Sequence, residues 1–105
     1  MKTYRVFITD DAKADLRRYT DYLKKIKNSP QAAKNIASDF RETRKKLENV
    51  AGILNEPASD VLKSKGLKRI NFLKHDYFML YYIDGKNAFI TNIFHALENF
   101  ENKLG

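Results

Sequence analysis

The chain has 105 residues, and 20 Lys and Arg against 13 Asp and Glu give it a net charge of +7, which favours contact with nucleic acid or an acidic protein. Hydrophobic residues make up 43% of the chain, enough for a modest core, which argues against intrinsic disorder. The absence of cysteine excludes disulfides, thiolate metal sites and a cysteine nucleophile, and favours the cytosol.

The first half of the chain predicts a strand followed by two helices. Residues 4–8, YRVFI, are β-branched and aromatic residues typical of a strand. Thr9 suits the N-cap of a helix whose apolar residues recur at helical spacing up to Ile26. The segment NSP at 28–30 starts a second helix, because its serine suits an N-cap and its proline the first helical position. We expect Gly52 to end this helix with a left-handed turn. Because the connection between the two helices is so short, we expect them to form an antiparallel hairpin.

The second half of the chain predicts three strands and a short helix. Turn residues dominate 52–66, where we expect irregular structure. The dipeptide DG at 84–85 indicates a hairpin between the last two strands. The expected strands are 67–73, 77–83 and 88–94, and apolar spacing after His95 predicts the terminal helix. The order β-α-α-β-β-β predicts an α+β fold, in which the helical hairpin packs on a C-terminal antiparallel sheet.

The length predicts a single domain over residues 1–105. The longest apolar run, residues 77–83, has seven residues, whereas a membrane span needs about 20. The N-terminal sequence MKTYRVFITDD resembles neither a signal peptide nor a transit peptide. We therefore expect a cytoplasmic protein with no membrane partner.

This order of elements, with these residues in it, resembles the RelE/ParE superfamily of toxins from bacterial type II toxin–antitoxin modules. The similarity covers nearly the whole chain and rests on YRVFITDDAKADL, on YLKK and NSPQAA, and on GLKRINFLKHDYFMLYYIDGKNAFITNIFH. The junction SPQAA and the entry Gly-Leu-Lys-Arg to a strand are most similar to the ParE branch. Many ParE-like toxins continue after the last strand with a glycine and paired arginines. This chain continues as HALENFENKL, which argues against a function that relies on a basic C-terminus.

The resemblance implies a growth-inhibiting toxin that a cognate antitoxin neutralises. RelE-like members cleave mRNA in the ribosome, whereas ParE-like members inhibit DNA gyrase, and the similarity to the ParE branch favours gyrase. Whether the chain is an enzyme stays open, and if it is one, we expect an mRNA endoribonuclease that needs no metal. No cofactor is implied. A further alternative is an inactive RNA- or protein-binding remnant of the fold.

The segment between Val61 and His75 carries five cations and no acid, the densest run of one charge in the chain. These cations are candidates for binding nucleic acid or another target: Lys63, Lys65, Lys68, Arg69 and Lys74. The alternative is a solvated strand edge whose lysines discourage aggregation. Arg69 stands out because a strand restricts the position of its side chain and because an arginine can bind a phosphate with two parallel hydrogen bonds. Its alternative role is an ion pair with an acid of the helical hairpin.

Two histidines are candidates for chemistry near neutral pH. His95 ends the last strand, where RNA-cleaving relatives place an acid–base histidine, so Arg69, Lys74 and His95 are the catalytic candidates if the chain is a nuclease. The alternative is a structural histidine that bonds a carbonyl at the end of the strand. His75 and the adjacent Asp76 are expected to form a hydrogen-bonded turn, and His75 is also a candidate for binding a phosphate.

Tyr77 is the last binding candidate, because a tyrosine beside a basic edge can stack on a base, although packing in the core is the alternative. Tyr77 and Tyr81 are expected on one face of the central strand, and Tyr82 on the other. A metal site at His75, Asp76, His95 and Glu98 is not expected, because nothing matches known ligand spacing.

Overall fold

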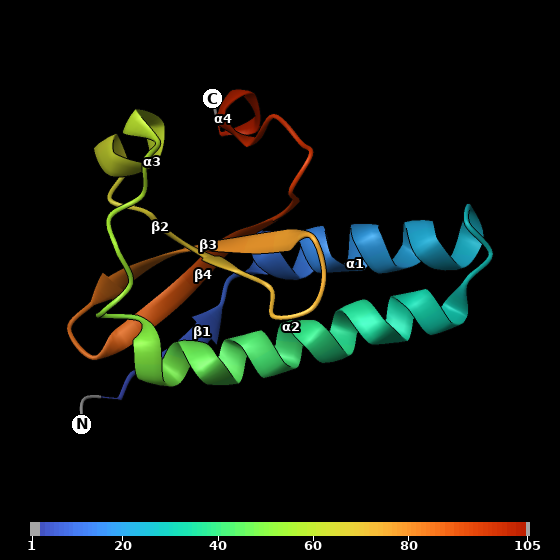
Figure 1. Ribbon diagram of the computed structural model, residues 1–105, viewed down its shortest axis with the longest axis horizontal. Helices are drawn as coiled ribbons and strands as arrows, with labels where there is room; N and C mark the ends of the chain where they lie inside the picture. Colours follow the sequence, from blue (N-terminus) through green and yellow to red (C-terminus); the bar gives the residue numbers. More distant parts are fainter. Residues whose placement is uncertain (1–2, 105) are drawn as a thin grey trace.

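The computed structural model describes residues 3–104, so Met1, Lys2 and Gly105 of the expected domain lie outside the described residues. The elements are β1 (Arg5–Ile8), α1 (Asp10–Lys25), α2 (Pro30–Val50), α3 (Asp60–Ser64), β2 (Lys68–Asn71), β3 (Tyr77–Asp84), β4 (Asn87–His95) and α4 (Phe100–Lys103). The α+β class, the helical hairpin and the short terminal helix are therefore confirmed (Figure 1). Among residues 3–104, no helix combines the length and the apolar character that crossing a membrane requires.

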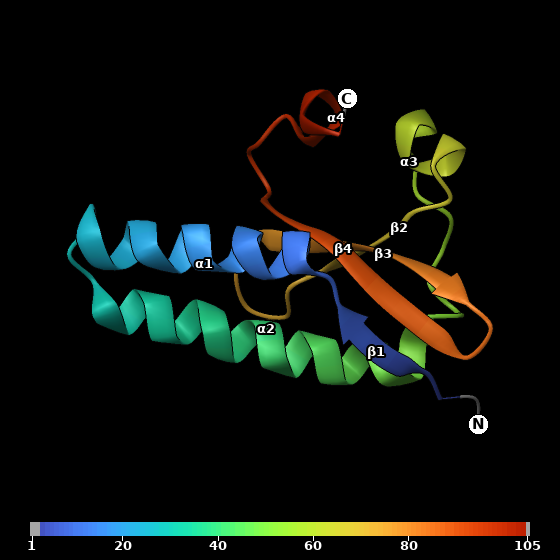
Figure 2. The same cartoon turned by 180° about the vertical axis from the view of Figure 1, so that it is seen from behind.

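The four strands form one mixed sheet in the order β1-β4-β3-β2. The three C-terminal strands are antiparallel, as expected, and β1 lies parallel to β4 at one edge (Figure 2). The hairpin between β3 and β4 pairs Asp84 with Asn87, so its two loop residues are Gly85 and Lys86. Gly85 adopts a φ of 63°, the left-handed conformation that the first loop position of a type II′ turn requires.

Two features of the segment after α2 differ from the expectation. Gly52 does not adopt a left-handed conformation, because only Gly66 and Gly85 among the described glycines have positive φ. A Cβ on Gly52 would lie 2.2 Å from the hydroxyl oxygen of Tyr4, so the glycine allows a close approach of that ring, which would have to shift to accommodate any other residue. The second difference is α3, whose Ser59 side chain caps the N–H of Leu62. A helix of five residues is too short to show a helical period in the sequence.

Helices α1 and α2 cover one face of the sheet, and the short α3 and α4 lie on the other (Figures 1 and 2). The larger core cluster joins the hairpin helices to the sheet and includes Phe40, Leu47, Met79 and Tyr81. The smaller cluster lies under α3 and α4 and consists of Leu62, Leu67, Phe78, Leu80 and Phe94, with Phe100 and Leu104 packed against it. The central strand β3 is therefore buried on both faces, which explains its uninterrupted apolar sequence.

Tyr77 and Tyr81 both contact the cluster under the hairpin helices, so the expected alternation of β3 is confirmed. Tyr81 is completely buried, and its hydroxyl donates a 2.8 Å hydrogen bond to the carbonyl of Ala51. Tyr82 is 38% exposed on the other face, where it stacks on Phe89. Tyr81 thus ties the end of α2 to the central strand.

Substituting Tyr81→Phe is expected to lower the free energy of unfolding by about 1–2 kcal/mol, because the buried carbonyl of Ala51 loses its donor while the ring stays in place. Tyr82→Phe is the matched control, since it removes the same atom from an exposed ring and should cost about 0.5 kcal/mol or less. Urea unfolding of both variants measures the difference. Equal losses for the two would contradict this role of the Tyr81 hydroxyl.

Candidate functional site

The turn between β2 and β3 is fastened to α2 by one buried carboxylate. Asp39 is 1% exposed, and its Oδ1 accepts the N–H of Leu73 at 3.1 Å. Its Oδ2 accepts the N–H of Lys74 at 3.1 Å and lies 2.6 Å from Nδ1 of His75. Thr43, one turn further along α2, also accepts the N–H of Leu73, at 3.2 Å. We call this arrangement of Asp39 and residues 73–75 the turn clamp.

A hollow of about 290 Å³ lies beside the clamped turn, and we call it the turn hollow. Its lining brings together four of the residues that the sequence singled out: Arg69, Lys74, His75 and Tyr77. The exposed Lys74 forms an ion pair of 3.1 Å with Glu42 of α2. The expected role of His75 as a partner of the neighbouring Asp76 is not what the structure shows, because the ring turns to Asp39 instead.

Arg69 is held on the sheet face that α3 and α4 cover. Its guanidinium lies 3.8 Å from the centre of the Phe78 ring, and its Nε donates a 2.9 Å hydrogen bond to Oδ1 of Asn71. Partial burial lowers the pKa of Arg69 below its usual value. The alternative of an ion pair with an acid of the helical hairpin is not seen, because Arg69 faces away from α1 and α2. An arginine fixed by an aromatic ring and an amide is suited to binding an anion.

The other three cations of the segment do not line the turn hollow. Lys63 and Lys65 are exposed, in α3 and at its C-cap. Lys68 is partly buried, and its ammonium donates a 3.1 Å hydrogen bond to the carbonyl of Leu54. Lys68 therefore helps to hold the loop after α2, whereas Lys63 and Lys65 remain available on the surface.

The strand β4 extends beyond the end of β1, and α1 closes its open edge. The N–H of Ile93 donates a 2.9 Å hydrogen bond to Oδ2 of Asp15. The N–H of His95 donates to the hydroxyl of Tyr19 at 3.2 Å and to Oε1 of Glu98 at 3.0 Å. Side chains of α1 thus replace the missing strand and fix the position of His95.

His95 lines a different hollow, of about 400 Å³, which we call the tyrosine hollow. Its lining consists of Arg18, Tyr19, Tyr22, Tyr77, His95, Leu97 and Glu98. The imidazole packs edge-on against Tyr77, and its Nδ1 accepts the N–H of Leu97 at 3.1 Å. His95 is therefore bonded to a backbone N–H, and not to a carbonyl, which leaves Nε2 to carry the hydrogen of the neutral ring.

The carboxylate of Glu98 is the electrostatic centre of the tyrosine hollow. Burial alone would raise its pKa, but hydrogen bonds from Lys103, Tyr19 and the N–H of His95 outweigh burial and lower the pKa to about 2. Burial and the hydrogen bond to Glu98 raise the pKa of Tyr19 to about 12. Burial, followed by the charge of Glu98, raises the pKa of Tyr77. Glu98 thus stays charged, and the Tyr19 hydroxyl stays protonated, over the physiological range.

The structure therefore divides the candidate residues between two places. Arg69 stacks on Phe78 of the cluster under α3 and α4, whereas His95 packs on Tyr77 on the face that α1 and α2 cover. Arg69 and His95 project from opposite faces of the sheet. The histidine that shares a hollow with Arg69 and Lys74 is His75.

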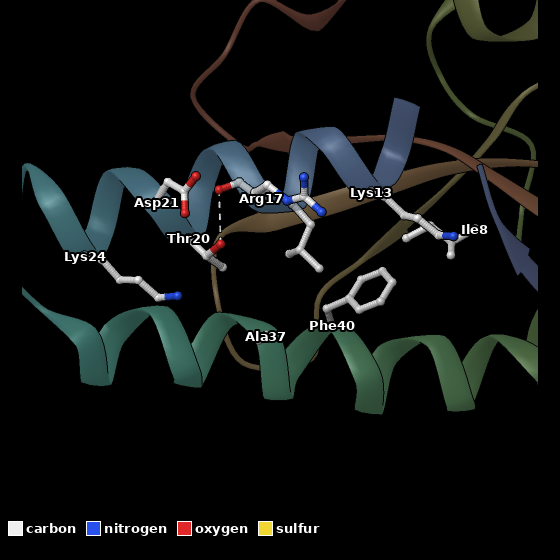
Figure 3. Close-up of a pocket in the computed structure, with 9 residues that line it drawn as sticks. Ile8, Lys13, Arg17, Thr20, Asp21, Lys24, Ala37 and Phe40 are labelled. Carbon is white, nitrogen blue, oxygen red and sulfur yellow. Dashed lines mark hydrogen bonds between the residues drawn. The ribbon is translucent and has the colours of Figure 1, made fainter. Parts of the chain in front are cut away.

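A third concavity, the interhelical groove, runs between α1 and α2 and has a volume of about 490 Å³ (Figure 3). Apolar side chains line its inner part, and Lys13, Arg17 and Lys24 extend from α1 around it (Figure 3). The complete lining is Ile8, Lys13, Leu16, Arg17, Thr20, Asp21, Lys24, Ala37 and Phe40. Such a groove offers apolar contacts inside and positive charge at its rim.

Asp39, Tyr19 and Arg18 were not predicted as site residues. A signal for Asp39 was present, because this acid lies within the apolar stripe that Ile36, Phe40 and Leu47 form along α2. An acid in a buried stripe must find hydrogen-bond donors. Tyr19 belongs to the apolar spacing of α1, and nothing in that spacing indicates that its hydroxyl accepts the N–H of His95. Within residues 3–104, no group of three or more His, Cys, Asp and Glu side chains is placed to hold a metal ion.

Comparison with known proteins identifies the relatives of the chain. A family model described as the ParE toxin of the type II toxin–antitoxin system, parDE, matches residues 6–100. Eleven chains of solved structures match as well, and no curated protein matches.

Two of these solved structures come from toxin–antitoxin systems. The match from the chromosomal ParDE system of P. aeruginosa is 24% identical and has a TM-score of 0.71, covering 89% of this chain and 96% of that one. The match from the RelBE2 complex of Mycobacterium tuberculosis is 18% identical and has a TM-score of 0.63, covering 93% and 97%. These similarities show a shared fold.

The low pKa of Glu98 predicts a loss of stability in acid. Because folding lowers this pKa from 4.5 to about 2, the stabilisation is complete above pH 4.5 and is lost as the pH falls towards 2. Glu98→Gln should therefore flatten the pH dependence of the free energy of unfolding in this window, measured by urea unfolding. An unchanged slope in the variant, or a Glu98 carboxyl that titrates by NMR at pH 4.5 or above, would contradict the assigned bonds.

Proposed function

Because the chain belongs to the ParE toxin family of type II toxin–antitoxin systems, we propose that it arrests bacterial growth by binding DNA gyrase, and that a cognate antitoxin neutralises it. In this proposal the toxin catalyses no reaction itself and acts in the cytoplasm, where gyrase works on DNA. The observation that carries the choice of gyrase is the separation of Arg69 from His95 on opposite faces of the sheet. A nuclease built on Arg69, Lys74 and His95 needs these groups around one scissile phosphate.

Ribosome-dependent mRNA cleavage remains the second candidate because of the surroundings of His95. Its imidazole borders the tyrosine hollow, where three tyrosine rings and the guanidinium of Arg18 offer surfaces that can stack on bases. A histidine at such a place has the chemistry of a general acid or base. This candidate requires RNA to enter the tyrosine hollow, and the cations of the separate turn hollow would then bind the RNA away from the reacting phosphate.

The interhelical groove is the surface that we propose for the antitoxin. Apolar side chains such as Leu16 and Phe40 line its inner part, and three cations of α1 surround it. A segment with an apolar stripe and acidic flanks is complementary to both features. The structural relatives come from toxin–antitoxin systems, which supports an antitoxin as the partner of this chain.

Induced expression in bacteria tests the proposal, with growth, primer extension on mRNA and DNA supercoiling by purified gyrase as the three readouts. We expect the parent chain to arrest growth and to inhibit supercoiling, and we expect His95→Ala to retain both effects because no chemistry depends on the imidazole. No new mRNA ends should appear. Cuts in mRNA that His95→Ala abolishes, with gyrase unaffected, would instead establish the nuclease. A parent chain that leaves growth unchanged would contradict both functions and favour an inactive remnant.

Co-expression of a candidate antitoxin, sought as a small reading frame next to this gene, tests the proposed neutralisation. It should restore growth, and Arg17→Glu should weaken the rescue because it reverses a charge at the rim of the interhelical groove. Lys45→Glu is the matched control, since Lys45 is an exposed cation of α2 that does not line the groove. Equal rescue of the two variants would show that the antitoxin binds another surface of the chain.

A further inference from the structure

The turn clamp fixes more than the backbone of the turn, because it also orients an imidazole. Asp39 accepts hydrogen bonds from the N–H groups of Leu73 and Lys74, and its Oδ2 lies 2.6 Å from Nδ1 of His75. An ionised carboxylate only accepts hydrogen bonds, so Nδ1 is the nitrogen that carries the hydrogen. A carboxylate that holds one ring nitrogen in this way sets both the tautomer and the direction of the other.

The other ring nitrogen, Nε2, is directed away from Asp39 and has no hydrogen-bond partner among residues 3–104. The side chain of His75 is 35% exposed and borders the turn hollow. His95 lacks this support, because its Nδ1 accepts the N–H of Leu97 and no carboxylate of residues 3–104 bonds to its ring nitrogens. His75 is therefore the histidine whose free nitrogen the fold presents to a ligand.

Two cations complete the turn hollow. Arg69 is held there by Phe78 and Asn71, as described above, and its planar guanidinium suits two oxygens of one anion. Lys74 pairs with Glu42, but both side chains are about half exposed or more, so a ligand displaces this pair at small cost. The acid that lines the hollow, Asp76, is exposed and forms no ion pair with the described residues.

We propose that the turn hollow binds a phosphate group of a nucleic-acid backbone through Arg69, Lys74 and Nε2 of His75, with Asp39 as the positioning residue. A phosphodiester has two charged non-bridging oxygens and two ester oxygens, so it can accept hydrogen bonds from the guanidinium, from the ammonium and from an imidazole ring that carries a hydrogen on Nε2. The proposal rests on the proposed function for its source of phosphate, which is the DNA that gyrase holds. Contact with that DNA would strengthen the binding of the toxin to the gyrase–DNA complex, although the toxin catalyses no reaction.

Titration of the purified chain with inorganic phosphate, and separately with a short DNA duplex, tests the site directly. Binding is detected by NMR of the histidine and arginine side chains. The titration is carried out at about pH 6, where an ordinary imidazole is mostly protonated and donates from both nitrogens. We expect His75 and Arg69 to shift with both ligands. Lys74→Gln and His75→Gln should each raise the Kd about tenfold, the loss expected for one charge-assisted hydrogen bond. Lys45→Gln is the control of equal charge and should leave the Kd for phosphate nearly unchanged.

Asp39→Asn separates a built site from general attraction to a positive surface. This change removes one negative charge, so general attraction predicts equal or tighter binding, whereas the turn clamp predicts binding about tenfold weaker because His75 is released. If this variant does not fold, the Kd values for phosphate of His75→Gln and Lys45→Gln are compared instead, and the proposal requires weaker binding by His75→Gln. Equal weakening by these two, or binding of a glutamate-rich peptide without binding of phosphate, would overturn the proposal. Phosphate binding by a chain that fails to inhibit gyrase would leave the site standing and refute the proposed function alone.

Discussion

The candidate site depends on the hydrogen bonds that the buried carboxylate of Asp39 accepts from the turn between β2 and β3. A carboxylate that is 1% exposed is strongly destabilising unless donors surround it, and the turn between β2 and β3 supplies those donors. The turn clamp therefore couples α2 to the short edge strand β2, which has only four residues of its own to define its position. Without the clamp, this turn would be an exposed loop, and Lys74 and His75 would have no fixed direction.

A second polar connection operates at the other side of the sheet. Asp15 and Tyr19 of α1 bond the N–H groups of β4 that lie beyond the end of β1. The same bonds place His95 and Glu98 at the rim of the tyrosine hollow. The two helices thus each support one hollow, α2 through Asp39 and α1 through Tyr19. One small sheet thus separates a hollow lined by Arg69 and Lys74 from a hollow lined mainly by aromatic rings.

Most of the fold could be predicted from the sequence because its elements have strong local signals. The helix starts depend on Thr9 and Ser29, and both side chains accept the capping hydrogen bond in the structure. The β3–β4 hairpin and the burial of β3 follow equally from a glycine-containing turn and an apolar run. By contrast, α3 is too short for a periodic signal, and the role of Gly52 depends on Tyr4, which is distant in the sequence.

The candidate site was less predictable than the fold, because it depends on contacts between distant residues. The basic segment was visible in the sequence, and Arg69 and Lys74 do border one hollow. The choice of His95 over His75 rested on position along the chain, and position does not reveal which side of a sheet a residue faces. Asp39 and His75 are 36 positions apart in the sequence, and only the folded chain brings the carboxylate to the imidazole.

The chain belongs to the ParE toxin family, and the turn clamp holds residues 73–75 of its candidate site in one conformation. Hydrogen exchange of the backbone amides of Leu73 and Lys74 tests that central claim most directly. Although both residues lie in an exposed turn, we expect their exchange to be as slow as that of the strand amides in β2, because Asp39 accepts both N–H groups. Exchange as fast as that of a freely solvated loop amide would show that the clamp does not persist in solution and would contradict the account.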